Sequence, residues 1–377
     1  MAKILLMSNL CEHNLHIRIF CSTFAAKTNV TTMYKIGIYK IVLVGLLAWV
    51  AGIIPVSAET LRVVSYNVEN LFHPKHDTVI TNEGVNELTN ERIFEKDDYE
   101  WTPDGERRWS YTRYYRKVEN IARVLTNIGE WDGVDIVGLQ EVENALCVKR
   151  ICYTLRPGEY DFVHYESPDP RGIDVALIYK KARIDTIATR AIRVSASLND
   201  GMSAAKPLNG ELITRDILYV QARVDKKDTL HFFVCHLPSQ RGGAAESEWK
   251  RKIARKVLQS AIDSVYAAFR APKIIVMGDF NSEPKEDLRG VKNRMKELTG
   301  THKYQGRWTC LDHFYTSPSL DSLSRAEIYN AAWIQEPDEK HLDLKPKRTY
   351  NGFRYQKDGF SDHLPILLKL KINKASL

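Results

Sequence analysis

The sequence of 377 residues lacks the motifs that mark several large enzyme classes. It has no Cys-x-x-Cys pair, no P-loop and no glycine-rich dinucleotide-binding loop, and it shows no repeats or low-complexity linkers. These absences argue against a dithiol redox centre, a P-loop nucleotide hydrolase and a nicotinamide-dependent dehydrogenase. A charged share of 27% and an aromatic share of 10% are instead those of a soluble globular protein.

A large net charge is also missing from the chain after residue 58. Residues 1–58 hold five of the 54 Lys and Arg side chains and one of the 47 acids, which leaves a net charge of +3 for residues 59–377. That excess is too small to indicate nucleic-acid binding by itself. The charge of +7 for the whole chain therefore overstates the basic character of residues 59–377.

Cysteine is scarce, and four of the six cysteines follow residue 58: Cys147, Cys152, Cys235 and Cys310. In an oxidising compartment they could form disulfides, and Cys147 and Cys152 are close enough in sequence to close a small loop. A chain of this length does not need covalent staples, so four buried thiols are an equal alternative. The sequence leaves both open.

The longest apolar run lies near the N-terminus, at residues 41–58. Lys35 and Lys40 precede it and small residues end it, so we expect a secretory signal peptide that is cleaved before Glu59. The apolar core is short for a membrane span of roughly 20 residues, which makes an uncleaved anchor the weaker alternative. Residues 1–58 are interpreted as an upstream extension and signal peptide, with Met33 as a possible true start. Export would place the mature protein in the periplasm or outside the cell.

Hydrophobic patterning predicts an α+β fold for the remainder. Helices are predicted at residues 111–131, where apolar residues recur at i, i+3, i+4 and i+7, and at 244–269, which Pro272 follows. Residues 72–108 are interpreted as a polar insertion at the rim of a site. Strands are predicted at 61–67, 135–139, 173–179, 213–224, 229–235, 274–277, 309–316 and 363–371, with a hairpin turn at 225–228.

Short polar motifs accompany the ends of these strands. Their carboxylates, amides and histidines are the groups that a divalent-cation phosphoesterase needs. A hard cation such as Mg²⁺ prefers oxygen ligands and usually takes only one or two carboxylates from the protein. Cleaving a phosphate ester also requires an activated water and donors to the extra negative charge. The motifs are SYNVEN (65–70), LQEVEN (139–144), HLPSQRGG (236–243), GDFNSEP (278–284), LDH (311–313) and SDH (361–363).

The order of these motifs resembles the endonuclease/exonuclease/phosphatase superfamily, which includes pancreatic-type deoxyribonucleases, sphingomyelinases and inositol-phosphate 5-phosphatases. The resemblance runs from about residue 61 to 370, and GDFN with QE upstream and a C-terminal SDH is specific as a set. It implies a single catalytic domain over residues 59–377, built as a four-layer α/β/β/α sandwich of two packed, mainly antiparallel sheets with outer helices. The active site would lie at one end of the sandwich.

The resemblance also implies a role for each acid and amide of the motifs. Glu141 would be a direct Mg²⁺ ligand, joined by Asp362, and Mn²⁺ could substitute for Mg²⁺. Asp279 would orient or deprotonate the attacking water, and Asn281 would donate to the developing charge. Asn67 would hold the phosphate or a metal-bound water.

Two histidines complete the predicted catalytic set. His363 would donate to a phosphate oxygen as an imidazolium, with Asp312 holding it charged and oriented. His236 would contact the phosphate or assist the leaving group.

Three further positions match the superfamily less specifically. Arg241 follows Pro238, which stands where many nuclease members carry an acid, and it could reach a phosphate or remain a solvated loop residue. Asp174, in RGID, and Arg215, in TRD, could contribute to the site or pair with each other.

Three functions are compatible with the sequence. A nuclease that acts on DNA or RNA is favoured, and a phosphoesterase for phospholipid or inositol phosphate is the alternative. An inactive binding protein of the same fold is disfavoured because nearly every expected polar position is filled. No stable protein partner is indicated, and a monomer is expected. A nucleic acid could contact a patch formed by Tyr111, Arg113, Tyr114, Tyr115 and Arg116.

Overall fold

A computed structural model describes residues 59–76, 78–81, 92–195, 212–283, 288–296, 298 and 300–372. All of them belong to one compact unit that covers residues 58–377. The predicted signal peptide at residues 1–58 lies outside the described residues. Within the described part, no helix has both the length and the apolar character needed to cross a membrane.

The first large sheet contains the strand that carries Asn67 and the strand that carries Glu141. Its central pair, β1 and β4, is parallel, and its other neighbours are antiparallel. The spatial order is β15 (Ser324–Ile328), β20 (Ile366–Ile372), β1 (Glu59–Leu71), β4 (Ile136–Val142), β6 (Asp174–Lys180) and β5 (Tyr160–His164).

The second large sheet repeats this arrangement, with one parallel pair, β9 and β10, among antiparallel neighbours. The predicted hairpin is confirmed as β8 and β9, and its turn contains Asp225 and Lys226 at positive φ. The spatial order is β11 (Lys292–Asn293), β14 (Asp312–Thr316), β10 (Lys273–Asp279), β9 (Asp228–His236), β8 (Ile217–Val224) and β7 (Ile184–Ile192).

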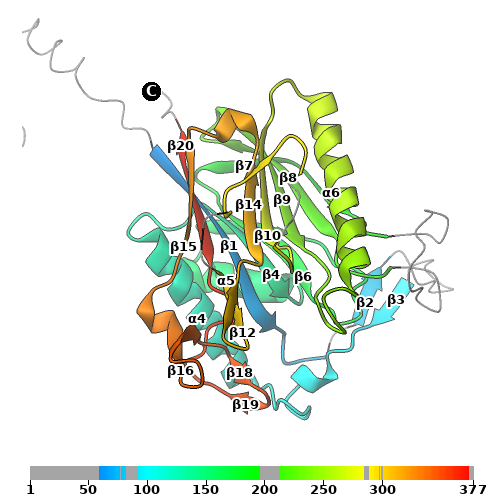
Figure 1. The fold of residues 1–377 in the computed structure, drawn as a ribbon, viewed down its shortest axis with the longest axis vertical. Helices are drawn as coiled ribbons and strands as arrows, with labels where there is room; N and C mark the ends of the chain where they lie inside the picture. The colour runs from blue at the N-terminus through cyan, green and yellow to red at the C-terminus, as the bar shows by residue number, and fades with distance from the viewer. Residues whose placement is uncertain are drawn as a thin grey trace, which may run out of the picture. The chain divides into compact units, whose positions relative to one another are not determined.

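Among the described residues, three α-helices cover the two sheets. Both predicted helices are confirmed, as α4 (Tyr111–Gly129) and α6 (Glu248–Ala268), and α5 (Ala145–Leu155) was not predicted. The side chain of Ser110 caps α4 and that of Asn144 caps α5, each by accepting a backbone N–H three residues later. Figure 1 shows α6 running along the second sheet, while α4 and α5 lie by the first.

The period of two along each strand divides the apolar side chains among three layers of core. The cluster between the sheets contains Met277 of β10 and Val63 of β1. Its neighbour Val64 points the other way, into the cluster under α4 and α5, and Val276 points into the cluster under α6. Burying one such side chain contributes about 1.5–3 kcal/mol, so this alternation fixes the strand register. The four-layer α/β/β/α sandwich is therefore confirmed.

Shorter elements connect the strands and helices of the sandwich. The insertion predicted at residues 72–108 contains β2, β3 and η1 within its described part, and residues 77 and 82–91 lie outside it. All four cysteines of this unit are free buried thiols, so the small disulfide loop considered for Cys147 and Cys152 is not formed. The short elements are β2 (Thr78–Thr81), β3 (Arg92–Glu95), η1 (Tyr99–Trp101), β12 (His302–Tyr304), β13 (Arg307–Thr309), η2 (Pro318–Leu320), η3 (Ala332–Ile334), β16 (Gln335–Asp338), β17 (Asp343–Pro346), β18 (Tyr350–Asn351) and β19 (Arg354–Tyr355).

Candidate active site

Strand register in the second sheet sets three predicted site residues side by side. His236 ends β9, Asp279 ends β10 and Asp312 begins β14. Asp279 is paired with His236 on one side and with Asp312 on the other. All three are buried, so the sheet alone creates a row of two acids and an imidazole at one end of the sandwich.

The glycine of GDFN is required by the backbone at this point. Gly278 has φ +142°, and a Cβ placed there would lie 1.9 Å from the carbonyl oxygen of Cys235 on the neighbouring strand. Only glycine allows β9 and β10 to approach this closely. The turn that follows is held by Asp279, whose Oδ1 accepts the N–H of Asn281 at 2.7 Å.

The first sheet adds Asn67 and Glu141 to this row. Asn67 donates from Nδ2 to Oδ2 of Asp279 at 3.0 Å, which joins the two sheets across the site. Glu141 lies at an irregularity in the β4–β6 pairing, with φ +64°. A bulge re-aims a side chain, and here Glu141 Oε2 accepts the N–H of Asn70 at 2.8 Å while Oε1 lies 3.8 Å from His236 Nε2.

The C-terminal motif brings in His363. The Ser361 hydroxyl donates to the Asn67 carbonyl at 2.7 Å, which fastens the motif to β1. His363 Nδ1 then lies 2.7 Å from Asp312 Oδ2, and Nε2 lies 3.8 Å from Asp279 Oδ2. The structure thus brings together Asn67, Glu141, His236, Asp279, Asp312 and His363, which we call the catalytic cluster.

Burial and neighbouring charges shift the pKa values of the two histidines in opposite directions. Burial alone would lower the pKa of His363, but the charges of Asp312 and Asp279 raise that pKa well above its ordinary value. Burial, with the nearby Arg215 and Arg171, lowers the pKa of His236 well below its ordinary value. His363 is therefore the cationic donor of the cluster, and His236 is neutral.

The surroundings of Asp279 give its carboxyl a pKa that suits a general base at neutral pH. Burial, reinforced by the charge of Asp312 and opposed by that of His363, raises its pKa to about 7. A carboxylate whose pKa lies near the working pH is suited to accept a proton from water.

Oxygen ligands for a divalent metal are present beside the cluster. Glu141 presents Oε1, which lies beyond hydrogen-bonding distance of His236. Asp362 offers a carboxylate oxygen within 4.8 Å of ring nitrogens of His302 and His363. Asp362 is already 2.6 Å from Arg348, whereas Glu141 has no such cation in contact among the described ion pairs. The donor set therefore fits a hard cation, with Glu141 better placed than Asp362 to hold it.

Asn281 and Arg241 are predicted to contact the charge on phosphate, and neither belongs to the catalytic cluster. Asn281 donates from Nδ2 to the carbonyl of Leu237 at 2.9 Å, so its amide braces the loop that follows β9. The side chain of Arg241 is exposed on that loop, and no ion pair joins it to the described residues.

The pairing considered for Asp174 and Arg215 is wrong. Arg215 pairs with Asp169 at 2.7 Å and donates to the carbonyls of His236, at 3.3 Å, and Leu237, at 2.9 Å. Arg215 therefore supports His236 through the backbone of that residue. Asp174 accepts the N–H of Ser167 at 3.1 Å, and the β4–β6 register sets Asp174 opposite Val142.

Several charged residues near the cluster were missed by the sequence analysis. Arg171 donates to the Asn70 side chain at 2.8 Å, and the His302 ring lies 4.8 Å from that of His363. Arg348 lies between Asp362 and Glu69, at 2.6 and 3.8 Å. Arg171 and Glu69 occur in the RGID and SYNVEN segments and could have been flagged there, whereas nothing in the sequence marks His302 or Arg348.

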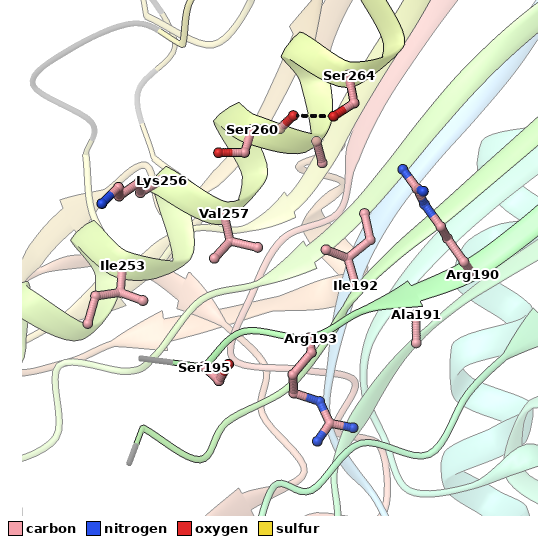
Figure 2. Close-up of a pocket in the computed structure, with 11 residues that line it drawn as sticks. Arg190, Ala191, Ile192, Arg193, Ser195, Ile253, Lys256, Val257, Ser260 and Ser264 are labelled. Atoms are coloured by element: carbon pink, nitrogen blue, oxygen red, sulfur yellow. Dashed lines mark hydrogen bonds between the residues drawn. The ribbon is translucent and has the colours of Figure 1, made fainter. Parts of the chain in front are cut away.

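A cavity of about 550 Å³ lies away from the catalytic cluster. Figure 2 shows it between α6 and the end of β7, with Arg190, Arg193 and Lys256 on its walls. It contains no residue of the cluster, so we assign the chemistry from the convergence of polar side chains rather than from cavity size.

Comparisons with known proteins agree with this geometry. Residues 62–372 match the endonuclease/exonuclease/phosphatase family. TDP2 from Caenorhabditis elegans is 14% identical over 86% of this chain and 80% of its own, with a TM-score of 0.50. A mannosyl-6-phosphatase from Bacteroides thetaiotaomicron is 16% identical over 83% of this chain and 100% of its own, with a TM-score of 0.49.

The catalytic domain of human Nocturnin is 16% identical over 82% of this chain and 93% of its own, with a TM-score of 0.47. At such identities the likeness extends to the fold alone. No curated protein sequence matches the chain. Because the family match covers most of the sequence, the chain belongs to the endonuclease/exonuclease/phosphatase family, whose members hydrolyse phosphate esters with divalent metal ions.

Proposed function

We propose that the protein is an exported, Mg²⁺-dependent enzyme that hydrolyses phosphodiester bonds of nucleic acid by in-line attack of water. The observation that carries the proposal is the convergence on Oδ2 of Asp279. Asn67 Nδ2 lies 3.0 Å from it, His236 Nε2 3.7 Å and His363 Nε2 3.8 Å. A base surrounded by three groups able to contact phosphate is the arrangement that hydrolysis of a phosphate ester requires.

The residues divide the reaction among them. Asp279 accepts a proton as the water oxygen forms its bond to phosphorus, and the bond from phosphorus to the leaving oxygen breaks on the opposite side. His363 donates from Nε2 to a phosphate oxygen as negative charge develops, because Asp312 occupies Nδ1 at 2.7 Å. Asn67 fixes the direction of the Asp279 carboxylate.

Glu141 would hold the divalent ion, and Asp362 would share it if its carboxylate turned from Arg348. When bound, the ion supplies positive charge that neutralises the phosphate and stabilises the leaving oxygen. Asn70 fixes Glu141 through the 2.8 Å hydrogen bond to Oε2, which leaves Oε1 directed at the cluster.

A rim of arginines and aromatic rings supports nucleic acid as the substrate. Arg107 lies 4.4 Å above the ring of Trp101 and 5.3 Å above that of Phe353, which is 63% exposed. Arg107 also lies 5.2 Å above the ring of Tyr350. The N–H of the neighbouring Thr349 donates at 2.6 Å to Glu69, two residues beyond Asn67 of the cluster. Exposed rings beside guanidinium groups can stack bases while the arginines attract the backbone.

The patch predicted on helix 111–131 contributes only in part. Tyr114 is buried, whereas Tyr111 and Tyr115 are 45% and 41% exposed. Arg113 lies 4.6 Å above the ring of Tyr355 and so joins the helix to the same rim.

The test is hydrolysis by the mature protein with Mg²⁺, measured on plasmid DNA, RNA, sphingomyelin and phosphoinositides. We expect cleavage of DNA or RNA, and we expect Asp279→Asn to abolish it. Cleavage of a lipid or inositol phosphate alone would overturn the assignment of substrate. Binding without hydrolysis of any substrate would overturn catalysis altogether. Asp263→Asn, on the exposed face of α6, is a matched control for loss of one acid.

A further inference from the structure

The loop between β5 and β6, residues 165–173, is closed at its base by three side chains that the proposed reaction does not use. His164 ends β5, Asp174 begins β6, and Glu166 lies in the loop. One potential metal-ligand atom from each lies within 4.8 Å of the others. The antiparallel pairing sets His164 opposite Ala176 and thereby fixes the two ends of the group.

Nε2 of His164 and Oδ2 of Asp174 are buried without a hydrogen-bond partner among the described residues, and Oε2 of Glu166 is buried beside Lys96. The side chains of His164 and Asp174 are only 2% exposed, and their two atoms lie 3.6 Å apart. A charge-assisted hydrogen bond would bring them to about 2.7–2.9 Å. Two ligands at about 2.1 Å from a tetrahedral ion would be about 3.4 Å apart. The spacing therefore suits a shared cation better than a shared proton.

The remaining contacts leave room for one more positive charge. Oδ1 of Asp174 is occupied by Ser167, through its N–H at 3.1 Å and its hydroxyl. Lys96 Nζ lies 3.0 Å from Oε2 of Glu166 and donates to the carbonyl of Glu143 at 3.3 Å, so it balances one carboxylate. Burial raises the pKa of Glu143 to about 9, so its side chain adds no charge at neutral pH.

We propose that His164, Glu166 and Asp174 bind a zinc ion, at a site built from different residues than the Mg²⁺ site at Glu141. One imidazole nitrogen with two carboxylate oxygens is a ligand set that zinc accepts, and water would complete the tetrahedron. Lys96 remains on Oε2 of Glu166 and orients that carboxylate.

The zinc site would fix a loop that supports the catalytic cluster at two points. Asp169 holds Arg215, which donates to the His236 carbonyl at 3.3 Å. Arg171 donates to the Asn70 side chain at 2.8 Å, and the N–H of Asn70 donates to Glu141. The ion would therefore stabilise the loop without touching substrate.

The experiment uses the mature chain carrying Glu141→Gln, so that the Mg²⁺ ligand is removed and the zinc site is kept. The metal-free protein is titrated with Zn²⁺ alone, and the stoichiometry, dissociation constant and Tm are measured. Co²⁺ then serves as a spectroscopic probe, since tetrahedral Co²⁺ absorbs visible light much more strongly than octahedral Co²⁺. Asp174→Asn keeps the shape and the Ser167 contact while removing a ligand, and Glu166→Gln changes a partly exposed residue.

We expect one Zn²⁺ per chain, a higher Tm with zinc, and intense Co²⁺ absorption. Asp174→Asn and Glu166→Gln should each weaken zinc binding at least about tenfold. His341→Ala, which removes a partly exposed histidine elsewhere, should leave binding unchanged. No zinc binding by the Glu141→Gln chain, or affinity that neither ligand variant alters, would overturn the proposal. Neither result depends on hydrolysis, so the proposed function is judged separately.

Discussion

The Nδ1 atom of His363 lies 2.7 Å from Oδ2 of Asp312, and both side chains are buried at the end of the sandwich. This contact fixes the ring so that Nε2 faces Asp279, 3.8 Å away. It also offsets the burial that would otherwise remove the charge from the imidazole. A cationic donor is thus held in place before any phosphate arrives.

Replacing His363 with alanine should lower kcat more than it raises KM. The imidazolium interacts most strongly with the charge that develops in the transition state, so its loss affects the chemical step rather than ground-state binding. A decrease in kcat of about 10²–10³-fold is expected. Steady-state kinetics on the best substrate measure it, with circular dichroism to verify folding. A folded variant with near wild-type kcat would show that the SDH histidine is structural.

Replacing Asp312 with asparagine should move the alkaline limit of activity to lower pH. In the wild type the raised pKa of His363 keeps the imidazole protonated above its ordinary value of 6.5. Asparagine removes the largest stabilising charge but leaves the donor, so the active form should be lost earlier as pH rises. The loss of kcat at low pH should be smaller than for His363→Ala. A pH profile identical to that of the wild type would contradict this role.

The core of the fold could be predicted from sequence because strand and helix periods are local properties. The strand predicted at 61–67 is part of β1, and the helix predicted at 111–131 is α4. The edge strand β7 was not, because five of its nine residues are exposed or charged and no apolar run marks it. Helix α5 is not predicted for a related reason, because it has only 11 residues and follows directly after the motif at 139–144.

A contact in the candidate site can be predicted when one motif contains both of its residues. It can also be predicted when the two residues lie in different motifs that the family resemblance pairs, as it does for Asp312 and His363. The contacts of Asp362 and Arg215 could not be derived, because their partners Arg348 and Asp169 lie in segments without a motif. Tertiary packing alone decides which cation meets which acid there.

Chelation should abolish activity, and Glu141→Gln should raise the metal concentration needed to restore it. The oxygen ligands beside the cluster suit Mg²⁺, so EDTA should stop hydrolysis and added Mg²⁺ or Mn²⁺ should restore it. Glutamine keeps the shape of Glu141 but removes its charge, so the activation constant for Mg²⁺ should increase by at least about tenfold. A metal titration of initial rates measures this. Full activity in EDTA would refute the role of the metal.

Export should remove the apolar run at residues 41–58 from the protein. The basic flank, the uncharged core and the small residues before Glu59 are typical of a cleaved signal peptide. N-terminal sequencing of protein recovered after export should begin at Glu59 or within a residue or two of it. Glu59→Pro, which hinders cleavage at that bond, is the matched variant. Recovered protein that retains residues 41–56 would show an anchor instead.

Replacing Gly278 with alanine should destabilise the fold far more than the same change at Gly242. Both glycines have positive φ, +142° and +86°, so each substitution carries a conformational cost of about 1–3 kcal/mol. At Gly242 the new Cβ meets no atom within 4 Å, whereas at Gly278 it would lie 1.9 Å from the backbone carbonyl of Cys235. Because β9 and β10 cannot separate without displacing His236 and Asp279, the Gly278 variant should lose more than about 4 kcal/mol or fail to fold. Denaturant unfolding of the two variants measures the difference, and equal stabilities would mean that the strands are not packed as closely as this contact requires.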